Sequence, residues 1–251
     1  MKKTLLALLA LGASLAPFCS CNRQDAAPEL PAFATITIGI APTYDTGTFP
    51  TTKGIADEIA ATLPSQMTLS LTNKASGESY EVLTGTQVRV PVGAYSVTGR
   101  TTPAVRQAIY GDTHYTSAEP LVVVEDDLEV ETGRTTYTVT AAYRCFVLAA
   151  EQAGAGGWAV KADGEWTAME HMTTPELWWT FVIGDFDADH PLRTMLTLSD
   201  GSGLDYAFYT RDPQAGGILA RYGCWYLLRS GSTTPQSGSL SLALPEWTAG
   251  N

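Results

Sequence analysis

Short segments in which apolar and polar residues alternate dominate this chain of 251 residues from residue 34 onward. In ATITIGIAP, Ile36, Ile38 and Ile40 fall two positions apart, so an extended chain presents them on one face. That period is typical of strands that bury one side and leave the other in water. The alternation recurs, between turns rich in Gly, Pro and Asn, in MTLSL, SYEVL, TQVRV, PLVVVEDDLEVE, RTTYTVTAAYRC, ELWWTFVIG, RTMLTLSD, DYAFYTR, CWYLLRS and GSLSLALPEW. The pattern predicts an all-β protein made of antiparallel β-sandwiches with little helix.

One segment has the period of a helix instead. In GIADEIAATLP, Ile55, Ile59 and Leu63 fall four positions apart, and Pro64 follows them. Apolar residues at that spacing share one face of a helix, and proline ends it. We expect one short amphipathic helix over residues 54–63.

The tryptophans divide the chain into two halves. All six lie beyond residue 157, although a single core would be expected to draw large aromatic residues from both halves. We therefore expect two tandem sandwiches, the first over residues 34–143 and the second over residues 144–251. A single long sandwich in which the halves interleave remains the alternative.

The first 20 residues have the composition of an export signal. Lys2 and Lys3 precede an apolar run from Thr4 to Phe18, which is too short to span a bilayer as a helix. The run ends in PFCSCNRQD, where cysteine is followed by a polar tail, as in bacterial lipoprotein signals. The alternative is an ordinary secreted protein that is cleaved elsewhere.

Two cysteines compete for the lipid in this segment. Cleavage before Cys19 would follow bulky Phe18, whereas Cys21 has the small Ser20 before it and Phe18 three positions back. We expect Cys21 to become the lipidated N-terminus, residues 1–20 to be removed, and residues 21–33 to form a polar tether.

The charge of the chain limits its partners. The formal net charge is −11, and loss of Lys2 and Lys3 with the signal would bring it to −13. Such an acidic chain is unsuited to binding nucleic acid or to electrostatic docking on anionic lipid. Attachment to the membrane would then depend on the N-terminal lipid alone.

Two more cysteines, Cys145 and Cys224, lie far apart in the sequence and share no metal-binding spacing. An exported protein can hold a disulfide, so a bridge between them is one interpretation. The other is that they are two small buried residues on separate strands.

Sequence motifs of familiar enzymes are missing. The three histidines form no pair at the spacing that binds zinc in a helix, Ser202 in DGSGLD lacks a nucleophile elbow, and no phosphate-binding glycine motif occurs. We expect no catalysis and no cofactor. The alternative is an extracellular hydrolase whose carboxylate pair is assembled only in the fold.

The segment DFDADHPL resembles the start of a calcium loop, with Asp185, Asp187 and Asp189 at alternate positions. It then departs from that pattern, because His190 stands where glycine makes the sharp turn and Leu196 where a glutamate should close the shell. We expect an acidic turn without a metal.

Exposed tryptophans could stack against sugars. Trp178 and Trp179 are adjacent, so in a strand they point to opposite faces and at most one is in the core. Packing in a core is the ordinary role for most of the six, which are Trp158, Trp166, Trp178, Trp179, Trp225 and Trp247. A glycan-binding surface lipoprotein is therefore the second hypothesis for function, and a row of solvent-facing tryptophans would favour it.

Three segments together resemble the fimbrillin-like lipoproteins of Bacteroidales. They are the SCN start, the stretch GESYEVLTGTQVRVPVGAYSVTG, and the ending GCWYLLRSGS followed by GSLSLALPEWTAGN. The resemblance implies two transthyretin-like sandwiches, a lipid anchor in the outer membrane at the cell surface, and a role in surface pili or adhesion.

The family's assembly mechanism also makes a prediction for this chain. Removal of one strand from a sandwich leaves a groove that a strand of another subunit can fill. A trypsin-like protease that cuts after a basic residue could act at Lys53, whereas Arg23 is too near the lipid to release a strand. The alternating Leu240, Leu242 and Leu244 fit either a donor strand or the domain's own last strand. The chain is short for a stalk subunit, which favours an anchor or accessory role, or a relative that no longer polymerises.

Overall fold

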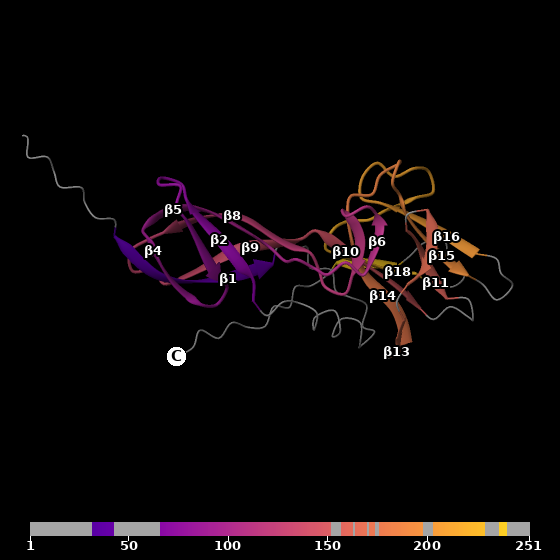
Figure 1. Ribbon diagram of the computed structural model, residues 1–251, viewed down its shortest axis with the longest axis horizontal. Coiled ribbons are helices and arrows are strands. Elements are labelled where there is room, and N and C mark those ends of the chain that lie inside the picture. The colour runs from indigo at the N-terminus through magenta and orange to yellow at the C-terminus, as the bar shows by residue number, and fades with distance from the viewer. Residues whose placement is uncertain are drawn as a thin grey trace, which may run out of the picture. The chain divides into compact units, whose positions relative to one another are not determined.

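The computed structural model describes residues 32–42, 66–151, 157–162, 164–169, 171–173, 176–197, 203–228 and 236–239. Every regular element in these residues is a β-strand (Figure 1). The prediction of an all-β fold is confirmed. The helix predicted over residues 54–63 lies outside the described residues.

Seven strands form the first sheet, sheet A, in the order β3-β2-β5-β8-β9-β1-β4. Their alternating sequences put every second side chain into a shared core and the others toward solvent, as burial along the strands shows. The strands are β1 (Phe33–Pro42), β2 (Thr68–Asn73), β3 (Ser79–Leu83), β4 (Gln87–Pro91), β5 (Gly93–Arg100), β8 (Val122–Val130) and β9 (Thr136–Tyr143).

Sheet A folds over on itself between β8 and β9. These strands pair only where residues 122–124 meet residues 141–143, after which β8 continues beside β5 and β9 beside β1. Where the ladder stops, the carboxylate of Asp126 accepts a hydrogen bond from the backbone N–H of Thr140 at 2.8 Å. That bond lowers the pKa of Asp126 and satisfies a backbone donor at the fold of the sheet.

The turn between β3 and β4 connects the two ends of the strand order of sheet A. Met67 and Thr84 exchange two hydrogen bonds, from Met67 N–H to Thr84 Oγ1 at 2.9 Å and from Thr84 N–H to Met67 O at 3.0 Å. Gly85 N–H donates to Ile38 O at 2.9 Å, which joins the same turn to β1. Sheet A is thus a sandwich with one layer of β3, β2, β5 and β8 and another of β9, β1 and β4.

The core of this sandwich is aliphatic, with tyrosines whose hydroxyls find backbone partners. Tyr95 Oη donates to Pro91 O at 2.7 Å, and Tyr137 Oη accepts from Glu131 N–H at 2.8 Å. The two layers meet through Ile36, Ile38, Leu69, Leu71, Val82, Val90, Tyr95, Val97, Val124, Leu128, Val130, Tyr137, Val139 and Ala141, all buried.

A second pair of sheets is built mainly from the later residues. Sheet B has the order β19-β18-β10-β14-β7-β6 with β13 also beside β14, and sheet C has the order β12-β11-β15-β16-β17. Their strands are β6 (Gln107–Tyr110), β7 (His114–Ser117), β10 (Cys145–Glu151), β11 (Trp158–Ala162), β12 (Glu165–Ala168), β13 (His171–Thr173), β14 (Glu176–Ile183), β15 (Leu192–Thr197), β16 (Gly203–Tyr209), β17 (Ile218–Leu219), β18 (Cys224–Leu228) and β19 (Gln236–Ser239).

An aromatic core lies between sheets B and C. Phe146 packs against Phe186, Phe208 and Tyr226 with ring centroids 5.8–6.3 Å apart, mostly edge to face. Edge-to-face pairs add stabilisation beyond the burial of area. Trp158 lies 6.0 Å from Tyr206 in the same cluster.

Among the described strands, three pairs are parallel, namely β1 with β9, β10 with β18 and β16 with β17. The other pairs are antiparallel, as the sequence predicted for the sandwiches as a whole. Parallel neighbours need long connections, and alternation within a strand does not reveal which distant strand lies beside it.

The hairpin of β6 and β7 pairs with β14 in sheet B, although its residues fall in the range assigned to the first predicted sandwich. All the described residues fall in one compact unit. The division at residues 143 and 144 stays a prediction, with β9 ending at Tyr143 and β10 beginning at Cys145.

Candidate functional site

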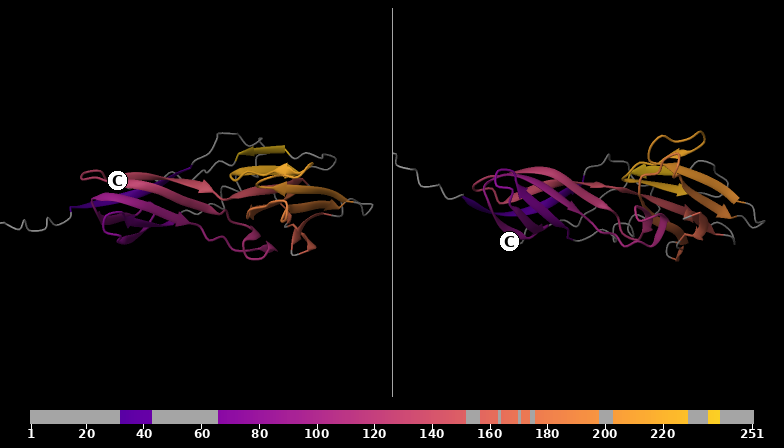
Figure 2. Two further views of the ribbon diagram at one scale, coloured as in Figure 1. Left: turned by 90° about the horizontal axis from the view of Figure 1, so that it is seen from above. Right: turned by 45° about the horizontal axis from the view of Figure 1, so that its top comes forward.

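The first strand of the chain, β1, is held by two neighbours, each of which pairs with one half of it. Residues 33–37 pair antiparallel with β4, and residues 37–42 pair parallel with β9. Only Thr37 is paired on both sides, and its N–H donates to Thr135 O at 2.7 Å. Figure 2 shows this strand, in indigo, among the other strands of sheet A in both views. One strand therefore bridges β4 and β9.

The inward side chains of β1 form part of the first core. Ile36 and Ile38 are completely buried and Ala34 nearly so. Burial of two isoleucines contributes roughly 3–6 kcal/mol at about 1.5–3 kcal/mol each. Outside the core, the guanidinium of Arg89 lies 4.9 Å from the ring centre of Phe33. Loss of β1 would expose this part of the core and leave backbone groups of β4 and β9 unpaired.

The other strand considered for exchange lies at an edge of sheet B. Residues 236–239 form β19, which pairs antiparallel with β18. Leu240, Leu242 and Leu244 lie outside the described residues. The structure shows residues 236–239, which precede these leucines, paired within their own chain.

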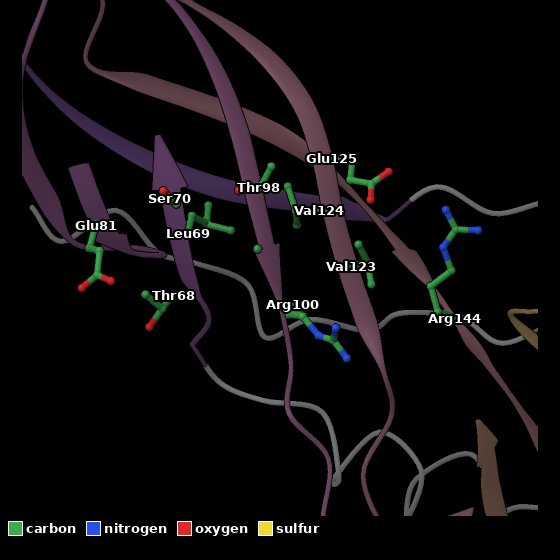
Figure 3. A pocket seen from close by; sticks show the side chains of 11 residues that line it. Thr68, Leu69, Ser70, Glu81, Thr98, Arg100, Val123, Val124, Glu125 and Arg144 are labelled. Carbon is green, nitrogen blue, oxygen red and sulfur yellow. The ribbon is translucent and has the colours of Figure 1, made fainter. Parts of the chain in front are cut away.

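A groove of about 480 Å³ runs over the outer face of sheet A (Figure 3). Leu69 and Val124 also line it, although both residues are completely buried. The outward side chains stand in cross-strand rows. One row runs Glu81, Ser70, Thr98, Glu125 across β3, β2, β5 and β8, and the next includes Thr68, Arg100 and Val123.

Two arginines stand at one side of this groove. Arg100 is opposite Val123 at the end of β5, and Arg144 follows β9. In Figure 3 the two side chains lie on either side of Val123, while Glu81 lies at the far side. Among the described residues, no carboxylate forms an ion pair with either guanidinium.

A second hollow, of about 400 Å³, also includes Arg144 and is lined by residues at one end of sheet B. The His114 Nε2 atom lies 2.7 Å from Asp185 O, so this nitrogen carries the proton and donates. Nδ1 of His114 then accepts from the Thr113 hydroxyl at 2.9 Å. Gly184 leaves room for the ring, because a Cβ there would lie 2.7 Å from His114 Cδ2.

Tyr222 completes this second hollow. Its hydroxyl donates to the Asp185 carboxylate and lies 3.1 Å from Gly184 O. Burial, followed by the bond to Asp185, raises the pKa of Tyr222, so it stays protonated as a donor. These contacts fasten the turn after β14 and give no sign of a nucleophile.

The acidic turn predicted at DFDADHPL is built by hydrogen bonds within the protein. Asp187 Oδ1 accepts from the N–H groups of Asp189 and His190, both at 3.0 Å, and Oδ2 accepts from Arg211 at 2.7 Å. The arginine, then the backbone donors, hold the pKa of Asp187 down to about 2. No group of three or more possible metal ligands occurs in the described part of the chain.

Cys145 and Cys224 are not joined by a disulfide. Gly223 N–H donates to Cys145 O at 2.9 Å, so the two segments are neighbours. Cys145, however, belongs to the buried cluster that contains the core of sheet A, whereas Cys224 packs against the aromatic core between sheets B and C. The two side chains therefore lie on opposite faces of sheet B. Successive residues of a strand point to opposite faces, so the thiols cannot meet. Burial raises the pKa of the Cys145 thiol to about 12.

The described tryptophans do not form an exposed row. Trp158, Trp179 and Trp225 are buried, Trp178 is half-buried, and only Trp166 is exposed, at 37%. The Lys161 ammonium lies 6.0 Å from the Trp166 ring. Trp247 lies outside the described residues. The structure therefore does not favour glycan binding by stacking on the described tryptophans.

Cys21 and Lys53, predicted for lipidation and processing, both lie outside the described residues. Within the described ranges, no helix is long and apolar enough to cross a membrane. Sequence reasoning did not single out Arg100 and Arg144. Their only signal was the scarcity of basic residues in an acidic chain.

No family model and no curated protein matches this sequence significantly. Solved structures of fimbrial proteins do resemble it. The tip fimbrial protein Mfa3 from Porphyromonas gingivalis, with a C-terminal truncation, is 9% identical with a TM-score of 0.42, over 68% of this chain and 92% of that chain. A fimbrial assembly protein from Parabacteroides distasonis is 11% identical with a TM-score of 0.39, over 80% and 92%.

A fimbrial protein from Bacteroides ovatus is 7% identical with a TM-score of 0.42, over 78% of this chain and 48% of that chain. The resemblance to Bacteroidales fimbrial proteins expected from the sequence is thus confirmed among solved structures.

Proposed function

We propose that this chain is a lipid-anchored cell-surface protein that acts without catalysis as a fimbrial anchor or accessory subunit, or as an adhesive component. Cys21 carries the lipid in the outer membrane. Strand exchange around β1 links the chain to other fimbrial subunits. The observation that carries this proposal is the position of β1, which supplies buried isoleucines to sheet A and joins β4 to β9.

The spacing between anchor and first strand supports the proposal. Residues 22–32 separate Cys21 from β1, and fully extended they reach at most about 40 Å. The folded part is therefore held close to the membrane surface.

The order of Cys21, β1 and Lys53 along the chain creates two states. An uncut chain keeps both its lipid and its own β1, as an anchor or accessory subunit requires. Cys21 and β1 both precede Lys53, so a cut after Lys53 leaves the lipid and β1 on one fragment and the remaining residues on the other. The cut chain is released and has an open groove between β4 and β9.

Three described groups with displaced pKa values have structural roles, which supports a role without catalysis. Asp126 caps a backbone N–H where sheet A folds, Asp187 holds a turn, and Cys145 is buried in the first core. Each of these three displacements has a structural cause, and none of the three groups lines either of the two hollows, whereas catalytic groups are displaced within a site that is open to substrate.

Limited digestion of the purified full chain with a trypsin-like protease tests the proposal. We expect the wild-type chain, once cut after Lys53, to form oligomers in size-exclusion chromatography, and Lys53→Gln to remain monomeric. Lys161→Gln, which changes a lysine in β11, is the matched control and should oligomerise like the wild type.

An excess of synthetic peptide with the sequence of residues 33–42 should suppress the oligomers by filling the open groove. The same peptide with Ile36→Asp and Ile38→Asp should not, because its inward positions carry charges. Strand exchange is excluded if the fully cut chain stays monomeric, or if both peptides act equally.

A further inference from the structure

We propose that the outer face of sheet A binds an acidic saccharide, with Arg100 and Arg144 holding a carboxylate of the sugar. The site is the groove in Figure 3, which lies outside the strands exchanged in the proposed function and is not lined by tryptophan. Its volume of about 480 Å³ lies within the range of ligand sites, about 300–1,000 Å³.

The two arginines supply the anion-binding part of this groove. Arg100, Val123 and Ala142 are directly opposite one another on β5, β8 and β9, and Arg144 follows Ala142 by two residues. At a strand spacing of about 4.8 Å, the two arginine Cα atoms lie roughly 12 Å apart. Long side chains can converge from that separation on one carboxylate above Val123.

Both guanidinium groups are available for a ligand. Arg100 and Arg144 are exposed, and no described carboxylate pairs with either. By contrast, two other basic side chains form ion pairs with carboxylates. Lys74 pairs with Asp127 at 2.7 Å, and Arg211 pairs with Asp187 at 2.7 Å. A guanidinium binds carboxylate through two parallel hydrogen bonds, which gives both affinity and orientation.

The rest of the groove suits the hydroxyl groups of a sugar. Thr68, Ser70 and Thr98 present hydroxyls on neighbouring strands, and Glu81 and Glu125 end the row as acceptors. Hydroxyls donate and accept, and carboxylates accept, so the row complements a chain of sugar hydroxyls. A peptide of aspartate and glutamate offers no such hydroxyls, which favours a saccharide over an acidic peptide.

Isothermal titration calorimetry of the purified full chain in detergent, with tetragalacturonate as the probe, tests this site. We expect binding that weakens as the salt concentration rises. Arg100→Gln and Arg144→Gln should each reduce the affinity about tenfold or more, as expected for loss of a hydrogen bond between charged groups. The matched control is Arg193→Gln, an exposed arginine of sheet C, which should bind like the wild type.

Two further measurements separate carboxylate recognition from sugar recognition. Fully methyl-esterified tetragalacturonate should bind at least about tenfold more weakly because its charge is absent. Thr98→Val removes one hydroxyl of the row, and it should weaken tetragalacturonate binding while leaving the unfolding midpoint close to that of the wild type.

Several results would overturn the site. One is that the wild type does not bind tetragalacturonate at all, and another is that the Arg100→Gln, Arg144→Gln double variant binds it as tightly as the wild type does. A third is that the wild type binds the methyl ester, or tetraglutamate, as tightly as tetragalacturonate. The proposal uses the proposed surface location only for access to the ligand. Calorimetry depends on neither lipid nor strand exchange, so failure of one proposal is distinguishable from failure of the other.

Discussion

Two carboxylates that look available in the sequence, those of Asp126 and Asp187, are occupied by the fold. Asp126 accepts the N–H of Thr140 where sheet A turns over, and Asp187 accepts two backbone donors and Arg211. Both have lowered pKa values, because hydrogen bonds and positive charge stabilise the ionised form. An acidic motif can thus be a turn or a cap rather than a metal site.

The pairing of Asp187 predicts a contribution to acid stability. Its pKa is about 2 in the folded chain and 3.8 ordinarily, so folding favours the ionised form. This stabilisation is present above about pH 4 and is lost as the pH falls through about 2. Asp187→Asn should therefore destabilise the chain at pH 5, and the difference from wild type should shrink toward pH 2.

Urea unfolding at several pH values between 2 and 5 measures this difference. Asp112→Asn, at an exposed turn between β6 and β7, serves as the control and should follow the wild type more closely. A constant difference between Asp187→Asn and wild type across this range would contradict the ionic role of Asp187.

At the scale of elements, close packing of strands limits which glycines can be replaced. A Cβ at Gly99 in β5 would lie 2.6 Å from Leu69 Cδ2 and 3.0 Å from Thr68 O. A Cβ at Gly39 in β1 would meet only Tyr137 O, at 3.8 Å. Leu69 is completely buried, so it has little freedom to move away.

Gly99→Ala should reduce the free energy of unfolding by about 1–3 kcal/mol through overpacking. Gly39→Ala, the matched control in the same sheet, should be neutral or slightly stabilising, because alanine loses less backbone entropy on folding. Denaturant unfolding of both variants measures the effect. Equal stability of the two would show that the β2–β5 contact is looser than the structure indicates.

At the scale of the whole molecule, the proposed lipidation of Cys21 would place the chain at the membrane. Cys21→Ser should abolish metabolic labelling with palmitate and release the chain from the membrane fraction, because its thiol is the proposed acceptor. Cys19→Ser should leave labelling intact, since Cys19 departs with the signal. The reverse outcome would assign the lipid to Cys19 and move the cleavage site.

Much of the fold could be predicted from alternation alone. Ile36 and Ile38, Leu69 and Leu71, and the alternating residues of β9 are buried as their period indicated. The partners of these strands could not be predicted, because alternation records which face is buried and not which distant strand lies beside it. The parallel pairing of β1 with β9 and the placement of the β6–β7 hairpin in sheet B are two such partnerships, which alternation could not predict.

The candidate sites divide in the same way. A lipidation site is a linear signal, so the proposed site at Cys21, with its small preceding residue, could be predicted without knowledge of the fold. The groove with Arg100 and Arg144 is assembled from β2, β3, β5, β8 and the end of β9, which meet only through strand pairing. The opposite faces taken by Cys145 and Cys224 likewise follow from the register between β10 and β18.

By itself, the sequence determined that this protein is all-β and acidic, and it predicted export and lipidation at the N-terminus. These properties follow from local period, composition and linear signals, which need no knowledge of distant contacts. Only the tertiary structure decided which strands hold β1, which tryptophans are buried, and which charged groups share a groove. Those depend on pairing between residues far apart in the chain, where the free energy is set by packing and hydrogen bonding in three dimensions.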